Sequence, residues 1–228
     1  MSPIASLFDR ISPKYDALNH LLSFNIDKVW RRKTAKTVAQ FSPKTILDLA
    51  TGTADLAIAV AKYNPQAHII GTDISEKMLE IGNAKIKKQK LENQIELHYG
   101  DAAKLPFEDN TFDVVTVAFG VRNFEDLNKG LSEIRRVLKP NGQAVILEFS
   151  MPERFPVKQL YRLYFKHFLP KIGKAVSKDA NAYEYLPASV ERFPKPKAFL
   201  TLLEQHGLTD ALAQPLTFGI VTLYTTHK

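Results

Sequence analysis

The chain of 228 residues contains no cysteine. This absence excludes disulfide bonds, thiolate metal sites and a cysteine nucleophile. No apolar run approaches the roughly 18 residues that a transmembrane helix needs. The opening stretch MSPIASLFDRISPKYD lacks the apolar core of a signal peptide. We therefore expect a cytoplasmic protein.

Acidic residues are scarce relative to basic ones, with 24 Asp and Glu against 31 Lys and Arg, so the net charge is +7. Such an excess suits a nucleic acid, an anionic membrane surface or a phosphorylated ligand, and it also serves solubility. The hydrophobic content is 45% and the charged content is 24%. Both values are ordinary for a globular protein. The length fits a single domain, alone or with an appended lid.

Predicted strands alternate with predicted helices between residues 45 and 150. The strands are expected at 45–50, 67–74, 95–101, 112–119 and 142–150, and the helices at 55–63, 76–90 and 127–138. This order is typical of βαβ units. It predicts an α/β fold of the doubly wound type, with a mostly parallel sheet that helices cover on both faces.

The C-terminal segment follows a different pattern. After a helix expected at 196–207, two strands at 208–216 and 218–227 lie too close together for a crossover, so they must pair antiparallel. A parallel sheet completed by such a hairpin differs from the usual nicotinamide-binding domain. It resembles the seven-stranded fold of class I S-adenosylmethionine (SAM) methyltransferases.

The stretch LDLATGTADL follows the first strand and has the position of a cofactor loop. The places of the G-x-G-x-G pattern hold Ala50, Gly52 and Ala54. A nicotinamide enzyme needs more glycines at these places to bind the pyrophosphate of its cofactor. SAM has no pyrophosphate, so small residues with Gly52 at the tightest point suffice. Thr53 offers a hydroxyl to the amino-acid end of SAM, and Asp48 either binds its ammonium through water or orders the loop.

Two further acids end predicted strands. Asp73 closes the second strand, where a carboxylate accepts hydrogen bonds from ribose hydroxyls. Asp101 follows the third strand and suits the adenine amino group, and Ala102 offers a backbone N–H. Because the carboxyl ends of parallel strands meet at one edge, these residues indicate a single site for SAM.

Four segments together resemble one family, the menaquinone/ubiquinone C-methyltransferases of the UbiE/COQ5 type. They are YDALNHLLSFNIDKVW (15–30), FGVRNFED (119–126), RVLKPNGQAVILEFS (136–150) and LPKIGKAVSKDANAYEYLPASVERFP (169–194). The chain departs from the family pattern at Leu18, Asp27, Ala118 and Asn141. The resemblance covers nearly the whole chain. It implies SAM-dependent methylation of a ring carbon of a prenylated quinol, with SAM against Thr53, Asp73, Asp101 and Ala102.

Methyl transfer from a sulfonium needs alignment and exclusion of water, but no metal, and no metal-ligand spacing joins the histidines. The ring carbon becomes nucleophilic as a ring hydroxyl loses its proton. We expect Arg122 to stabilise the oxyanion, or to take the proton through water, and Asn123 to fix the ring oxygen. Tyr15 and Asp16 are expected in a lid over the ring, where Asp16 is either a base or a helix cap.

The expected domain organisation is a single methyltransferase domain, 1–228, with an N-terminal helical lid (1–40) and a helical insertion (151–195). The substrate pocket is expected to include Asn19, Tyr183 and Tyr185. Residues 156–178 form a basic amphipathic pattern that suits either an anionic membrane surface, at the inner face of the membrane, or packing against the domain. A homodimer is a further expectation.

Two other classes remain open from the residues alone. A nucleic-acid methyltransferase fits the positive charge, but the chain has no cysteine to attack a pyrimidine and no N/D-P-P-Y/F motif, so we expect no nucleic-acid partner. A non-enzymatic SAM-binding protein would have no use for Arg122 and Asn123. Among quinols we expect demethylmenaquinol, with the benzoquinol precursor of ubiquinone as the alternative.

Overall fold

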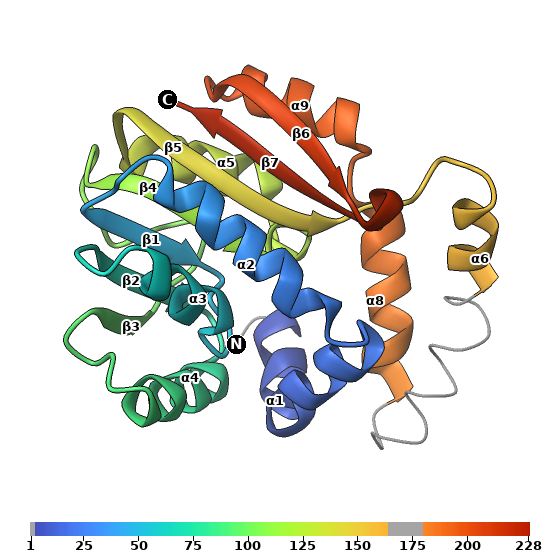
Figure 1. The fold of residues 1–228 in the computed structure, drawn as a ribbon, viewed down its shortest axis with the longest axis horizontal. Coiled ribbons are helices and arrows are strands. Elements are labelled where there is room, and N and C mark those ends of the chain that lie inside the picture. The colour runs from blue at the N-terminus through green and yellow to red at the C-terminus, as the bar shows by residue number, and fades with distance from the viewer. Residues whose placement is uncertain (1–2, 164–179) are drawn as a thin grey trace.

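The computed structural model describes residues 3–163 and 180–228, and a seven-stranded sheet lies at its centre (Figure 1). The strand order is β3-β2-β1-β4-β5-β7-β6. The strands are β1 (Thr45–Leu49), β2 (His68–Asp73), β3 (Ile95–Tyr99), β4 (Phe112–Ala118), β5 (Leu138–Phe149), β6 (Thr209–Leu216) and β7 (Val221–His227). This arrangement confirms the predicted α/β class.

The pairing of the strands follows their burial. β1 and β4 are apolar on both faces and lie side by side, parallel, in the middle of the sheet. β7 pairs antiparallel with both β5 and β6, which confirms the C-terminal hairpin. β5 begins earlier than the sequence predicted, because Leu138 already pairs with Phe112 ahead of an irregularity in the β4 register.

Helices connect the strands where the sequence places them. They are α1 (Pro3–Leu22), α2 (Ile26–Ala39), α3 (Asp55–Tyr63), α4 (Glu76–Lys88), α5 (Leu127–Val137), α6 (Val157–Leu163), α8 (Ala180–Arg192) and α9 (Pro196–Gln205), with short 3-10 turns η1 (Val121–Asn123) and η3 (Thr217–Gly219). Ser75 caps α4, because its Oγ accepts a hydrogen bond from the Met78 N–H at 3.2 Å. Such a cap satisfies a backbone donor that the first turn of a helix leaves free. Asp126 caps α5 in the same way through the Lys129 N–H.

Two hydrophobic cores lie on the two faces of the sheet. One packs α2, α3 and α4 against the strands, and the other packs α5 and α9 against the opposite face. β1 contributes to both cores, with Ile46 in the first and Leu47 in the second, as its alternating side chains require. The cores fix the loops at the carboxyl edge of the sheet.

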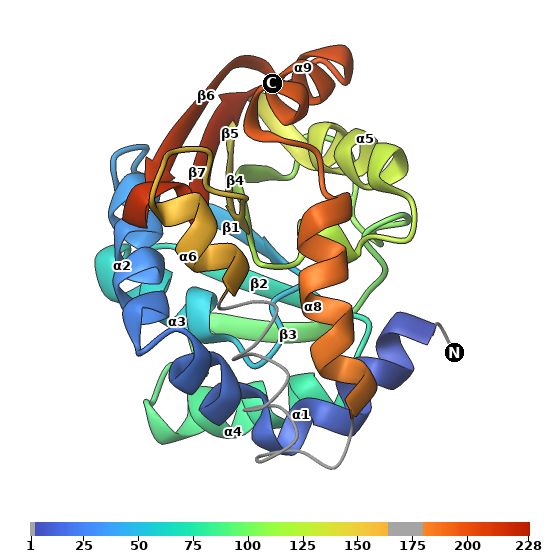
Figure 2. The same ribbon diagram turned by 90° about the vertical axis from the view of Figure 1, so that its right-hand side faces the viewer.

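The remaining helices gather beyond the carboxyl ends of the parallel strands, where α1 and α8 stand near each other (Figure 2). Within the expected lid, only α1 projects over this edge, since α2 packs on α3 and β5 as part of the body. The basic helix predicted for 156–178 is described only as α6, and the remainder of that segment lies outside the described residues. Among the residues described, no helix is long and apolar enough to cross a membrane.

Candidate active site

The loop after β1 has an unusual backbone. Ala50, Gly52 and Ala54 all have left-handed conformations, with φ of 54°, 56° and 64°. Alanine in this region costs about 1–2 kcal/mol relative to right-handed conformations. The three positions therefore keep the geometry of the glycine pattern, although two of them carry a methyl group.

Close packing accompanies this strain. A Cβ added at Gly120, just after β4, would lie 2.6 Å from the Ala50 Cβ. A Cβ added at Gly52 would meet nothing within 4 Å. The loop is thus pressed against the end of β4 on one side and leaves open space at Gly52 on the other.

Asp48 orders the loop from within. Its carboxylate accepts hydrogen bonds from the Thr51 and Thr116 hydroxyls, both at 2.6 Å, and the residue is 1% exposed. Burial raises the pKa of Asp48 to about 6, against the opposing effect of these hydrogen bonds. The residue does not line the neighbouring cavities, so the structure favours the second of its two expected roles.

The smaller of two adjoining cavities, about 120 Å³, lies at the carboxyl edge of the sheet. Gly52, Asp73, Asp101 and Ala102 line it, which brings four of the six predicted cofactor residues together. Asp73 accepts hydrogen bonds from the Gly52 N–H at 2.8 Å and the Ser75 N–H at 2.9 Å. Burial raises the pKa of Asp73 above its ordinary value.

The lining of this cavity fits the nucleoside part of SAM. Asp73 and Asp101 present carboxylate oxygens, which accept hydrogen bonds from hydroxyl and amino groups. The open space at Gly52 admits a ligand close to the backbone. Ala118, one of the departures from the family pattern, also lines the cavity and offers no hydroxyl.

Thr53 and Asp16 are placed elsewhere. The Thr53 hydroxyl donates to Asp16 Oδ1 at 2.6 Å, and Lys85 Nζ lies 2.7 Å from Asp16 Oδ2 and donates to Thr53 Oγ1 at 2.9 Å. Neither Thr53 nor Asp16 lines the two cavities. The expected contacts of Thr53 with SAM and of Asp16 with the ring are therefore not supported, because the two side chains are engaged with each other and with Lys85.

This cluster, Asp16–Thr53–Lys85, joins α1 to the loop before α3 and to α4; we call it the α1 latch. Lys85 also pairs with Asp55 at the start of α3. A second tie runs from the Ser75 hydroxyl to Asp9 on α1, at 2.6 Å. Together these contacts hold α1 across the mouth of the smaller cavity, where Phe8 and Tyr15 line its wall.

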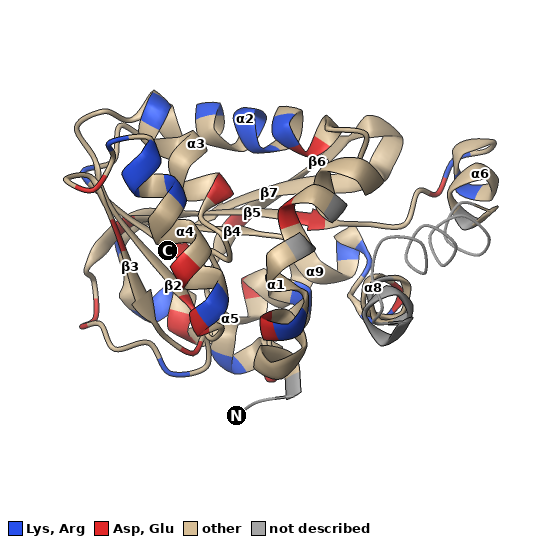
Figure 3. Ribbon diagram, turned by 90° about the horizontal axis from the view of Figure 1, so that it is seen from below, with Lys and Arg blue, Asp and Glu red and all other residues tan. Residues whose placement is uncertain are grey.

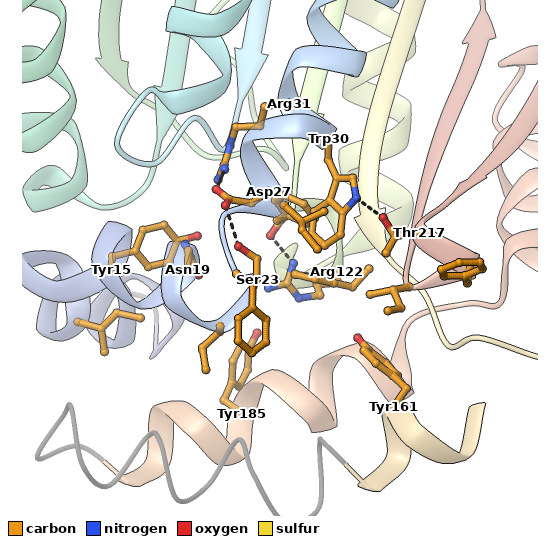
Figure 4. Close-up of a pocket in the computed structure, with 18 of the residues that line it drawn as sticks. Tyr15, Asn19, Ser23, Asp27, Trp30, Arg31, Arg122, Tyr161, Tyr185 and Thr217 are labelled. Atoms are coloured by element: carbon orange, nitrogen blue, oxygen red, sulfur yellow. Dashed lines mark hydrogen bonds and ion pairs between the residues drawn. The ribbon is translucent and has the colours of Figure 1, made fainter. Parts of the chain in front are cut away.

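The larger cavity, about 480 Å³, is enclosed by α1, α2, α6, α8, η1 and η3 (Figure 4). It is lined by Asn19 and Tyr185, which were expected in the substrate pocket, and by Tyr15 and Arg122, which were expected beside the ring. The other lining residues are mostly apolar and include Leu7, Ile11, Leu22, Trp30, Phe149, Val157, Leu160 and Ile220. Phe8, Tyr15 and Phe119 line both cavities, so the two spaces adjoin at these three residues.

Arg122 is the best-anchored polar residue of the larger cavity. Its Nη1 donates to Glu148 Oε1 at 2.7 Å and also to the Phe119 carbonyl, and its backbone N–H donates to Glu148 Oε2 at 3.2 Å. Its Nε donates to Ser189 Oγ on α8 at 3.3 Å. Glu148 has no solvent exposure, and burial raises its pKa while Arg122 opposes the shift.

Asn123 lies on the other side of the same turn. It lines the smaller cavity, and its Oδ1 accepts a hydrogen bond from the Tyr185 hydroxyl at 2.9 Å. Burial raises the pKa of both Tyr15 and Tyr185, so their hydroxyls stay protonated. Tyr183 belongs to α8, but its side chain lies outside the described residues.

Two polar groupings beside the larger cavity were not predicted from the sequence. Glu148 was identifiable only as a single charge in the apolar run AVILEF. The other grouping centres on Asp27, which accepts hydrogen bonds from Ser23 at 2.7 Å and His20 at 2.8 Å and pairs with Arg31. Burial acts to raise the pKa of Asp27, but Ser23 and Arg31 outweigh it and hold the pKa below its ordinary value. Within the described ranges, no group of three or more His, Asp or Glu side chains is arranged to hold a metal ion.

Comparisons with known proteins agree with this geometry. The profile of the ubiE/COQ5 methyltransferase family matches residues 2–228. A demethylmenaquinone methyltransferase of Bacteroides fragilis is 47% identical over 99% of this chain and 92% of its own length. The ubiquinone/menaquinone biosynthesis C-methyltransferase UbiE of Geobacter sulfurreducens is 43% identical over 99% of this chain and 88% of its own length.

Solved structures resemble the fold at lower identity. A SAM-dependent methyltransferase of Aquifex aeolicus has a TM-score of 0.66 at 18% identity, covering 93% of this chain and 97% of its own. The phosphoethanolamine N-methyltransferase 2 of Haemonchus contortus, in complex with S-adenosyl-L-methionine, has a TM-score of 0.63 at 15% identity, covering 86% of this chain and 52% of its own. These likenesses concern the fold alone.

Proposed function

The chain belongs to the ubiE/COQ5 methyltransferase family, and we propose that this SAM-dependent enzyme methylates the ring of demethylmenaquinol to give menaquinol. The name of the Bacteroides fragilis relative supports the choice of substrate. The large, mostly apolar cavity beside the smaller polar-edged one supports it physically, because the reaction brings a hydrophobic quinol to a nucleoside cofactor.

SAM, when bound, supplies an electrophilic methyl group. In the proposed reaction Asp73 and Asp101 hold the nucleoside by accepting hydrogen bonds, and the apolar walls of the larger cavity exclude water. The quinol ring lies in the larger cavity, next to the shared wall formed by Phe8, Tyr15 and Phe119. This placement brings the ring carbon toward the cofactor side.

The position of Arg122 is the main support for the proposal. Its guanidinium lines the quinol cavity and is fixed by Glu148, so it offers a positive charge in a defined place. A ring oxygen that loses its proton is stabilised there, which raises the nucleophilicity of the neighbouring carbon. Arginine is a poor free base, so its role is electrostatic. It favours the ionised quinol, whose proton passes to bulk solvent before the ring is enclosed in the cavity. Tyr185 lines the larger cavity and orients a ring oxygen by hydrogen bonding. Asn123 lines the smaller cavity instead, and it acts on the ring through Tyr185, whose hydroxyl donates to it.

The test is methyl transfer from labelled SAM to demethylmenaquinol in detergent, with the product identified by mass spectrometry. Arg122→Ala should lower kcat about 100-fold or more, as expected when one stabilising donor is removed. The matched control is Arg192→Ala, which removes an exposed arginine of α8 and should leave kcat unchanged. Label entering RNA instead of quinol, or quinol methylation that is indifferent to the loss of Arg122, would overturn the proposal.

One observation supports a second possible substrate. The Geobacter sulfurreducens relative is named for ubiquinone as well as menaquinone biosynthesis. The alternative substrate is therefore the polyprenyl methoxy-benzoquinol of ubiquinone biosynthesis. Parallel kcat/KM measurements with the two quinols decide between them, and we expect the higher value for demethylmenaquinol.

We also propose that the enzyme works in the cytoplasm against the inner face of the membrane, since a prenylated quinol resides in the bilayer. The absence of a spanning helix among the described residues is compatible with attachment at the surface. A homodimer stays a prediction, which sedimentation analysis checks.

A further inference from the structure

We propose that an exposed apolar surface around the mouth of the quinol cavity docks on an anionic lipid bilayer. This surface, the apolar rim, consists of Phe24, Val29, Phe155, Leu160, Leu163 and Phe218. The inference rests on the proposed function only in that the tail of the quinol would pass through this mouth. It differs from the sequence-based expectation, which placed membrane contact in residues 156–178 alone.

Three segments far apart in the sequence form the rim. The α1–α2 turn, α6 and the β6–β7 turn contribute Phe24, Leu160 and Phe218, and all three residues also line the larger cavity. The Trp30 indole N–H donates to Thr217 Oγ1 at 2.8 Å, which fixes the β6–β7 turn beside α2 (Figure 4). The rim is therefore the outer edge of the substrate pocket.

Val29 extends the same surface along α2. It is 60% exposed, and it lies three residues after Ile26, which lines the cavity, so the two share a helix face. Phe155 precedes α6 and is 81% exposed. Large apolar side chains exposed in one contiguous patch mark a site of interaction on a protein surface.

Two of the three aromatic residues of the rim have an unusual backbone conformation. Phe24 and Phe218 have left-handed conformations, with φ of 52° and 58°, and are 74% and 80% exposed. Bulky residues rarely adopt this region, because it costs about 1 kcal/mol or more. Both rings are therefore exposed, although contact of an apolar ring with water and a strained backbone are each unfavourable. A ligand that buries the rings would remove the unfavourable contact with water.

The charges beside the apolar rim indicate which kind of ligand the rim binds. On α2 the exposed charged residues next to Val29 are Lys28, Arg32 and Lys33, whereas Asp27 is buried against Arg31 (Figure 3). The other side of the rim adds Lys158, and there Glu153 is offset by its neighbour Arg154. Basic residues flanking an apolar surface fit anionic headgroups above acyl chains. A second copy of the same rim would bring like charges together, which disfavours a dimer through this surface.

The size of the cavity also favours a bilayer as the ligand of the apolar rim. Its volume of about 480 Å³ is that of a pocket for a drug-sized molecule. A ring with the first part of a prenyl tail fits that space, and a longer tail must continue beyond the mouth. With the rim on the bilayer, the tail remains among acyl chains while the ring enters the pocket.

The experiment measures binding of the full chain to quinone-free vesicles by flotation. Vesicles of equal parts phosphatidylglycerol and phosphatidylcholine are compared with vesicles of phosphatidylcholine alone. The apolar test is the double variant Val29→Ser/Phe155→Ser, whose two positions belong to the rim but do not line the cavity, and its matched control is Leu212→Ser on β6, which is 68% exposed. The charge test is Lys28→Gln/Arg32→Gln, with Lys87→Gln/Lys88→Gln on α4 as its control. Circular dichroism confirms that each variant is folded.

We expect the chain to bind the anionic vesicles, and both rim variants to weaken that binding about tenfold or more, while the controls bind normally. Equal binding to both kinds of vesicle, or no difference between rim and control variants, overturns the proposal. So does a concentration-dependent dimer that Val29→Ser/Phe155→Ser dissociates. Because the vesicles contain no quinone, vesicle binding without quinol methylation would contradict the proposed function and leave the rim standing.

Discussion

Arg122 and Glu148 form a buried ion pair, with the Nη1 and Oε1 atoms 2.7 Å apart. The pair joins the turn after β4 to the end of β5, and it holds the Arg122 charge at the wall of the quinol cavity. Removing one partner of a buried pair leaves the other charge uncompensated, which is more costly than the pair itself is stabilising.

Glu148→Gln tests this relationship. We expect the free energy of unfolding to fall by about 3 kcal/mol or more, because Arg122 keeps its charge without a counter-ion. We also expect kcat to fall about tenfold, since the guanidinium is no longer fixed, while SAM binding measured by calorimetry stays close to that of the unaltered enzyme. Glu96→Gln, at an exposed pair with His68, is the control and should change stability little, since water screens such a pair. A folded Glu148→Gln enzyme with full kcat would show that Glu148 does not position Arg122.

Asp48→Asn tests the buried acid beneath the loop. The folded pKa of about 6 lies above the ordinary value of 3.8, so the protonated carboxyl is favoured by folding. This contribution is fully present below pH 3.8 and is lost as the pH rises through about 6. Its total is about 3 kcal/mol. Asparagine does not titrate, so the Asp48→Asn variant does not lose this contribution to stability as the pH rises.

Denaturant unfolding of both proteins checks the effect. The stability of Asp48→Asn relative to the unaltered chain should increase by about 3 kcal/mol between about pH 4 and pH 7. The same comparison for the exposed Glu92→Gln should show no comparable trend. A difference that stays constant across this window would mean that Asp48 titrates normally.

Asp16→Asn tests the α1 latch. The substitution removes the charge that pairs with Lys85 and weakens the contact with Thr53, so α1 is held less firmly over the smaller cavity. We expect SAM to associate and dissociate several-fold faster in stopped-flow experiments, with a loss of about 1 kcal/mol in stability. Glu80→Gln, an exposed residue of α4 near the latch, is the control. Unchanged exchange rates would show that α1 does not gate the cofactor.

Ala50→Gly tests the strain in the cofactor loop, where Ala50 has a left-handed backbone. Glycine removes the cost of a left-handed alanine, which is about 1–2 kcal/mol. It adds an entropic cost of about 0.5–1 kcal/mol. We expect a net gain in stability of about 0.5 kcal/mol. Ala59→Gly, in the middle of α3, should instead lose about 1 kcal/mol. A destabilised Ala50→Gly protein would indicate that the methyl group packs better than its backbone suggests.

Periodicity and spacing predicted most of the fold. The alternation of strands and helices and the C-terminal hairpin both depend on local pattern, and the structure confirms them. The cofactor edge was also predictable in part, because parallel strands bring Asp73 and Asp101 to one side. The order of strands and helices in the sequence was enough to predict this placement of the two acids.

Side-chain direction was not predictable in the same way. Asp16 and Tyr15 are neighbours in the sequence, yet Tyr15 lines both cavities and Asp16 points to Lys85. The reason is that adjacent helical residues lie about 100° apart around the axis. Glu148 and the Asp27 cluster were missed for a related reason. Their partners come from other elements or from neighbouring turns on either side, so only the folded chain pairs them.

Phe8, Tyr15 and Phe119 form a wall that the two cavities share. A ligand that orders these side chains from one side changes the wall met by a ligand on the other. Thermodynamic linkage then requires the effect to be reciprocal: if SAM tightens quinol binding by some factor, quinol tightens SAM binding by the same factor. If one ligand orders this shared wall differently from the free protein, each dissociation constant depends on whether the other ligand is bound.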